Sequence, residues 1–155
     1  MADLKRYGIN KGEGHEHEEI LYTIAFLYNI IGNEIARYLA QHNLTVGKLN
    51  ILIAIKHHGG EKGIRQVEVS KHLIVTPSNM TKMIDKLEKE GLVERSALKG
   101  DRRVNIVKVT PKGAGLLDSI WESYNVQLKK AVSPLNKVKQ KQLAALLTEW
   151  FEKLQ

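Results

Sequence analysis

Apolar side chains recur at every third or fourth position over a long stretch that begins at Ile20. This spacing places them on one face of an α-helix. The face is formed by Ile20, Ile24, Leu27, Ile31, Ile35 and Tyr38. Leu21, Tyr28 and Leu39 form a second stripe. Because a helix that is apolar on more than one side needs more than one packing partner, we predict a helix over 18–43 with at least two neighbours.

Three further helices are predicted in the middle of the chain. Thr45 is a side chain typical of an N-cap, and the helix that it opens ends at the His-Gly-Gly sequence of residues 58–60. A short helix follows over 65–73. Thr76 and Pro77 then provide a cap and a first-turn proline for a fourth helix, which ends at Gly91.

Two short runs with β-like alternation, 92–95 and 104–110, flank a polar turn at 99–103 and predict a hairpin. Thr110 and Pro111 provide the same cap and first-turn proline for a fifth helix, which breaks at Pro134. A last apolar stripe runs from Leu143 to Leu154.

The predicted order of elements is typical of a mainly α (α+β) winged helix-turn-helix with long N- and C-terminal dimerisation helices. The expected parts are a flexible N-terminal arm at 1–17, an N-terminal dimerisation helix at 18–43, a winged helix-turn-helix lobe at 44–112 and C-terminal dimerisation helices at 113–155. A second copy of the chain is the economical partner for the long apolar helices, which predicts a homodimer.

Charge distribution favours a polyanionic partner. The 155 residues carry 24 Lys+Arg and 17 Asp+Glu, and residues 59–112 hold 12 of the former and 7 of the latter, a net charge of +5. A solvated lysine-rich surface is the alternative. The absence of cysteine excludes disulfides and thiol chemistry. No apolar run reaches the roughly 18 residues that span a bilayer, and the polar start is not a signal peptide, so we expect a cytoplasmic protein without a membrane partner.

The fourth predicted helix has one apolar and one polar face. Met80, Met83, Ile84 and Leu87 recur at core spacing. The opposite face, with its edges, presents Ser78, Asn79, Thr81, Lys82, Asp85 and Lys86. Apart from Asp85, these side chains can hydrogen-bond to base edges or phosphates in a major groove, although every surface helix has a polar face.

The predicted hairpin has a basic tip. Arg102 and Arg103 lie there, flanked by Lys99 and Arg95. A guanidinium fits the narrow minor groove of A·T-rich DNA. Asp101 would repel phosphate, so we interpret it as an orienting partner that accepts a hydrogen bond from Arg103. An ordinary charged turn is the alternative.

The segments Gly-Leu-Val-Glu-Arg at 91–95 and Asp-Arg-Arg-Val-Asn-Ile-Val-Lys-Val-Thr-Pro-Lys-Gly at 101–113 resemble the wing signature of the MarR family. The resemblance extends over about residues 20–153. It implies a winged-helix homodimer that regulates transcription, usually as a repressor, on a pseudo-palindromic operator in double-stranded DNA. It implies that Asp101 and Arg103 take the Asp-x-Arg roles and that 78–86 contains the recognition face. Arg65 departs from the family's usual Thr or Ser, which weakens a helix cap and adds a phosphate contact.

Family members often respond to a small-molecule effector, and the aromatic residues suited to a pocket near the dimer helices are Tyr22, Phe26, Tyr28, Trp121 and Tyr124. Simple core packing is the alternative for each of them. His15 and His17 could bind a metal only with a third ligand, so we predict no metal site and no cofactor. His57 and His58 end a helix, where the dipole favours a partly charged imidazole.

No nucleophile–base pair, phosphate loop or paired-carboxylate spacing supports an enzyme. Two alternatives to a DNA-binding regulator are a winged-helix protein–protein adaptor and a metal-responsive regulator of the same fold.

Overall fold

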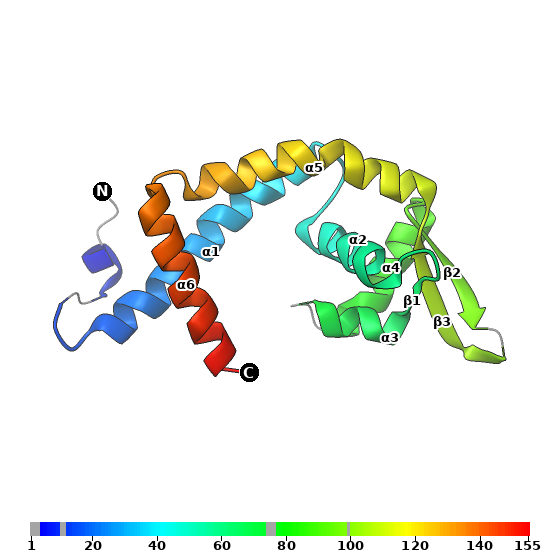
Figure 1. Cartoon of the computed structure of the whole chain (residues 1–155), viewed down its shortest axis with the longest axis horizontal. Coiled ribbons are helices and arrows are strands. Elements are labelled where there is room, and N and C mark those ends of the chain that lie inside the picture. The colour runs from blue at the N-terminus through cyan, green and yellow to red at the C-terminus, as the bar shows by residue number, and fades with distance from the viewer. Residues whose placement is uncertain (1–3, 10–11, 74–76, 99) are drawn as a thin grey trace.

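The computed structural model describes residues 4–9, 12–73, 77–98 and 100–155, and at residues 77–79 and 102 it describes the backbone alone. Three long helices dominate the chain: α1 (Glu16–Ala40), α5 (Pro111–Val132) and α6 (Lys137–Lys153). Helices α1 and α5 run side by side, and α6 follows a turn at the end of α5 that is remote from the lobe (Figure 1). The helix predicted over 18–43 corresponds to α1, which begins two residues earlier and ends three residues earlier.

A small lobe is formed at the other end of α5. Its helices are α2 (Val46–Gly59), α3 (Gln66–Val69) and α4 (Pro77–Lys89). The apolar side of α4 is buried, as the spacing of its residues predicts, and it packs against α2. The lobe core also receives residues from α1, the sheet and the start of α5; its fully buried centre includes Leu49, Leu52, Ile55, Val69, Ile84, Leu87, Val107 and Ile120.

The sheet has three antiparallel strands in the order β1-β3-β2, where the sequence predicted only a hairpin. The strand that sequence analysis missed is β1 (Ile64–Arg65), whose Arg65 is paired with Ile106. The helix predicted over 65–73 is therefore wrong in its bounds: it divides into β1, α3 and a 3-10 helix at Ser70–His72. Gly63 explains the change, because a Cβ there would lie 2.9 Å from the carbonyl oxygen of Val107, and the chain must approach β3 closely.

The wing strands are longer than predicted. They are β2 (Val93–Leu98) and β3 (Asp101–Val109), and Leu98 is in register with Asp101 across an irregularity in the ladder. Asp101 and Arg103 thus lie in a strand, and the prediction that they belong to the turn is wrong. Cross-strand pairing extends the ladder into this polar segment, which has no apolar alternation to announce a strand.

Threonine side chains cap the N-termini of α2 and α5, as predicted. The Thr45 hydroxyl accepts a hydrogen bond from the backbone N–H of Lys48, and that of Thr110 accepts one from Gly113 at 3.1 Å. Thr110 also donates to the carbonyl oxygen of Gly91. A Cβ at Gly113 would lie 2.1 Å from the carbonyl oxygen of Leu92, so this position accepts only glycine. The predicted cap Thr76 lies outside the described residues.

The N-terminal segment contains local structure. Leu4–Tyr7 forms a 3-10 helix, Ile9 is buried, and the ring of Tyr7 lies 4.6 Å from that of Phe26. Helix α1 begins at Glu16, inside the stretch predicted as an arm. The mobility of 1–17 stays a prediction.

Many large apolar side chains on the long helices are exposed in the single chain. On α1 they are Ile20, Leu21, Tyr22, Ile24, Leu27, Tyr28 and Ile30, and at the C-terminal end they are Val138, Leu143, Leu146, Leu147, Trp150, Phe151 and Leu154. Within the described ranges, no helix combines the length and the apolar character needed to cross a membrane.

Candidate nucleic-acid interface

The outer face of α4 presents polar side chains to solvent. Thr81, Lys82 and Lys86 are exposed, opposite the buried Met80, Ile84 and Leu87. Ser78 and Asn79 fall in the first turn of the helix, but their side chains are not among those described. The described part of this face therefore offers one hydroxyl and two ammonium groups on a rigid support.

Helix α3 contacts α4 through a polar pair. The side-chain amide of Gln66 donates to the Thr81 hydroxyl at 3.3 Å, while the amide oxygen of Gln66 is buried without a partner. Gln66 is a residue that sequence analysis did not single out, since its partner is 15 positions away and no local pattern joins them. The contact orients a hydroxyl on the outer face of α4.

Arg95 has an internal role that sequence analysis did not predict. Its guanidinium, in a side chain only 20% exposed, donates to Asp85 Oδ1 at 2.5 Å and lies 3.4 Å from Glu88 Oε2. Arg95 belongs to β2, whereas both carboxylates belong to α4. The pair therefore ties the wing to the helix, and two carboxylates neutralise the cation that was expected to face DNA.

Arg103 has the opposite environment. Its side chain is 96% exposed, and its guanidinium nitrogen Nε lies 3.7 Å from Asp101 Oδ1. The same carboxylate oxygen accepts a hydrogen bond from the backbone N–H of Arg103 at 2.9 Å. The expected orienting contact is thus made mainly to the backbone, which leaves the guanidinium extended into solvent.

The remaining basic residues predicted for the interface are spread over two places. Arg65 is exposed at the end of β1, next to the start of α3, and makes no side-chain cap hydrogen bond there. Arg102 lies in β3 beside Arg103, although its side chain is not described, and Lys99 lies outside the described residues. Helix α3 and the wing tip lie at the same end of the lobe, away from α1 and α5 (Figure 1).

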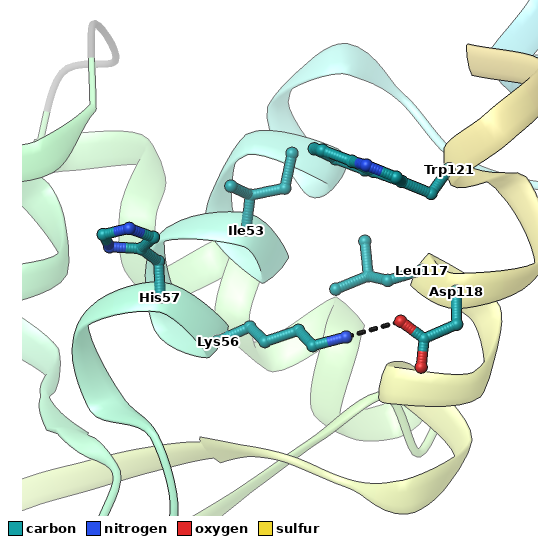
Figure 2. Close-up of a pocket in the computed structure, with 6 residues that line it drawn as sticks. All are labelled: Ile53, Lys56, His57, Leu117, Asp118 and Trp121. Atoms are coloured by element: carbon teal, nitrogen blue, oxygen red, sulfur yellow. Dashed lines mark hydrogen bonds and ion pairs between the residues drawn. The ribbon is translucent and has the colours of Figure 1, made fainter. Parts of the chain in front are cut away.

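A cavity of about 310 Å³ lies between α2 and α5. Its lining residues are Ile53, Lys56, His57, Leu117, Asp118 and Trp121. Figure 2 shows the Trp121 ring lying across the apolar part of this pocket and Lys56 Nζ hydrogen-bonded to Asp118 Oδ1 at 2.6 Å. This pair joins the lobe to the long helix. Its two residues are 62 positions apart, so no spacing in the sequence could have paired them.

Only Trp121, of the five aromatic residues proposed for a pocket, lines this cavity. The Tyr124 ring lies 6.2 Å from that of Trp121 and 6.3 Å from that of Tyr38, and burial raises the pKa of Tyr124. Phe26 contacts Tyr7, and Tyr22 and Tyr28 are exposed on α1. The structure does not bring the five together.

The histidines form a cluster outside the predicted N-terminal pair. The rings of His58 and His72 stack at 3.7 Å, and those of His57 and His58 lie 4.7 Å apart. Burial lowers the pKa of His58, and the charges of His72 and His57 lower it further. The lowered pKa disfavours the charged imidazole that the helix dipole was expected to favour at His58.

The imidazole nitrogen Nδ1 of His15 lies 3.6 Å from Glu18 Oε1. In the part of the chain that is described, no group of three or more His, Cys, Asp or Glu side chains has the arrangement of a metal site.

Comparison with known proteins identifies related sequences and structures. Residues 44–104 match the family model described as MarR family. HTH-type transcriptional regulator MhqR of Bacillus subtilis is 25% identical over 118 residues, which cover 76% of this chain and 79% of that protein. The S. aureus MepR–DNA complex superposes with a TM-score of 0.76 at 20% identity, covering 85% of this chain and 96% of that one.

A mutant MarR from E. coli complexed with operator DNA gives a TM-score of 0.77 at 23% identity and covers 90% of this chain and 98% of that one. At these identities the two structural matches establish the fold. The predicted winged helix-turn-helix with long flanking helices is confirmed.

Proposed function

The chain belongs to the MarR family of transcriptional regulators, and from that premise we propose that it binds double-stranded DNA sequence-specifically as a homodimer. The role that goes with the family is repression at a pseudo-palindromic operator. A regulator of this kind acts where genomic DNA is, so we also propose a cytoplasmic location.

The contrast between two arginines carries the proposal. Arg95 is held by two carboxylates and fixes the wing against α4, while Arg103 is almost fully exposed on that fixed support. A rigid base with one extended guanidinium is suited to a minor groove, and the exposed Thr81, Lys82 and Lys86 of α4 are suited to the neighbouring major groove. We assign the DNA contacts to 44–112, with Ser78, Asn79 and Arg102 included from the sequence pattern.

The unpartnered apolar faces support the homodimer. Helix α6 buries none of its residues in the single chain, although its apolar stripe includes Trp150 and Phe151. Water-exposed apolar area on this scale marks a surface that associates. A second copy that covers it would place two recognition helices in successive major grooves, about 34–36 Å apart.

The test begins with fragments of the source genome that the purified protein retains, from which a duplex operator is defined. On that duplex, Arg103→Ala is expected to weaken binding by about 1–3 kcal/mol, most strongly where the flanks are A·T-rich. Lys130→Ala, which also removes one cation but at the far end of α5, is the matched control and is expected to bind as the wild type does. An unchanged affinity for Arg103→Ala on every duplex would contradict the wing assignment. A wild-type chain that retains no duplex at low salt would contradict the function and favour an adaptor.

We further propose that a small-molecule effector releases the DNA by entering the cavity between α2 and α5. The Lys56–Asp118 pair supports this role, because it bridges the lobe and the long helix at the cavity edge. A ligand that separates the two charges would alter the angle between lobe and dimer helices, and with it the spacing of the recognition helices. Binding of DNA in the presence and absence of candidate ligands, with Trp121→Ala as the insensitive variant, tests this step.

A further inference from the structure

A second open cavity, of about 560 Å³, lies between the end of α2, β1 and the α3–3-10 segment. We call it the histidine groove. The charged and titratable side chains that line it are His58, Lys62, Arg65, Glu68, Lys71 and His72. Three permanent cations and two imidazoles thus face a single carboxylate, although only Arg65 among them was predicted as a DNA contact.

The cations of this groove have no counter-ions within the described part of the chain. Among the residues that the structure describes, Lys62, Arg65 and Lys71 make no ion pair, and the neighbouring Glu68 pairs with none of them. By contrast, Lys48, Lys56 and Arg95 elsewhere in the lobe each contact a carboxylate. Like charges gathered without compensation repel one another, so the arrangement is favoured by an external anion.

The position of the groove identifies the source of that anion. One wall is formed by Leu98 and Ile106 of the wing strands, and the opposite wall by α3, whose Gln66 contacts Thr81 on α4. The groove therefore lies between the wing and the segment that supports the recognition helix. A DNA strand that runs from the major groove contacted by α4 to the minor groove entered by Arg103 presents its phosphates to the surface between them.

We propose that the histidine groove binds backbone phosphates of the operator, as a third DNA contact beside α4 and the wing, and that the His58 imidazole, stacked on His72, takes up a proton when the phosphates arrive. The inference rests on the proposed function.

The stacked imidazoles explain the proton uptake. Rings 3.7 Å apart at an angle of 11° stack well when neutral. The neighbouring His57, Lys62, Arg65 and Lys71 oppose protonation of His58, and Glu68 is the only acid among the described residues that line the groove. Consistently, the pKa of His58 lies below its ordinary value in the free protein, through burial and the charges of His72 and His57. The single negative charge of a backbone phosphate reverses this balance, because an opposite charge favours the protonated ring. Binding then consumes protons, and affinity rises as the pH falls.

The first experiment measures the salt dependence of operator binding for wild type and for the double variant Lys62→Gln/Lys71→Gln. Each lost phosphate contact lowers the slope of log K against log salt by about 0.9, so a dimer is expected to lose about 1.8 per substitution. The charge-matched control is Lys129→Gln/Lys130→Gln at the far end of α5, whose slope is expected to equal that of the wild type. Equal slopes for wild type and the Lys62/Lys71 variant would overturn the inference while leaving the proposed function intact.

The second experiment measures operator affinity at pH 6 and pH 8 for wild type and for His58→Gln/His72→Gln. The wild type is expected to bind several-fold more tightly at pH 6, and the variant to lose most of this difference while retaining its thermal midpoint. A pH effect of the same size in both proteins would overturn the role of the two rings.

Addition of inorganic phosphate at constant ionic strength, balanced with chloride, separates the two sources of the anion. Equal affinities in the two salts support a DNA phosphate. Specific inhibition by phosphate that disappears in Lys62→Gln/Lys71→Gln would assign the groove to a free anion and overturn the DNA contact.

Discussion

Helix α4 and helix α6 carry apolar stripes of similar spacing, but they stand in opposite environments. In α4 the side chains of Ile84 and Leu87 are fully buried, whereas Phe151 of α6 is 61% exposed. The lobe therefore completes its core within one chain, and the long helices do not. The comparison teaches that the lobe buries its core without a second chain while the long helices leave apolar area exposed, so substitutions in the two regions are expected to have different effects.

The largest effect is expected from charges placed on the α6 stripe. Leu147→Asp/Phe151→Asp would put two carboxylates per chain into the exposed apolar stripe that we propose pairs with a second copy, and each unpaired buried charge costs several kcal/mol. We expect a folded monomer with strongly reduced operator affinity, measured by sedimentation equilibrium and by duplex titration.

Ala145→Asp provides the control for that variant. Position 145 is exposed on the opposite side of α6, and the substitution brings the same side chain into the same helix. It is expected to remain dimeric. A dimeric Leu147→Asp/Phe151→Asp protein would show that α6 is not part of the dimer contact.

A cavity in the lobe is expected to have the next largest effect. Ile84→Ala removes a fully buried side chain from α4, and such truncations cost about 2–5 kcal/mol. Urea unfolding, followed by the signal of the lobe, measures the loss. Lys86→Ala on the exposed face is the control and is expected to change stability by less than about 0.5 kcal/mol. Equal losses for the two variants would contradict the assignment of inner and outer faces.

The two arginines of the wing allow an ion-paired side chain and an exposed one to be compared within the lobe. Arg95→Ala leaves Asp85 and Glu88 without their cation, and we expect a loss of about 1–3 kcal/mol in unfolding free energy. Arg103→Ala removes an exposed side chain and is expected to leave the thermal midpoint unchanged while it weakens DNA binding. Thermal unfolding of both proteins, each with its duplex affinity, gives the result. The reverse ranking of their stabilities would contradict the roles that we assign.

Local patterns predicted the elements that depend on local physics. The stripe of α4, the Thr45 and Thr110 caps and the proline start of α5 follow from residues a few positions apart, and the structure contains each of them. Strand β1 escaped prediction because two residues that pair with β3 across about forty positions leave no periodic trace.

The candidate site divides in the same way. The exposure of Arg103 could be inferred from a polar segment, but the binding of Arg95 to Asp85 and Glu88 depends on how β2 packs against α4. The pocket was harder to predict from the sequence. Its lining joins Lys56 of α2 to Asp118 of α5. Tyr22 and Tyr28 were proposed because they are aromatic, but they are exposed on α1 and line no part of this cavity.

The smallest effect is expected at the junction of the two regions, the Lys56–Asp118 pair. Both side chains are largely exposed, so solvent screens the attraction, and Asp118→Asn is expected to cost at most about 1 kcal/mol of stability, less at high salt. If the pair holds the lobe at a set angle to α5, the same variant is expected to alter the effect of an effector on operator affinity while leaving unfolding nearly unchanged. Glu122→Gln, one helical turn further along α5, is the matched control, and urea unfolding together with duplex titration in the presence of ligand measures both quantities. A stability loss of several kcal/mol would instead make the ion pair part of the folded core of the lobe, and would contradict its role in setting the angle between the lobe and α5.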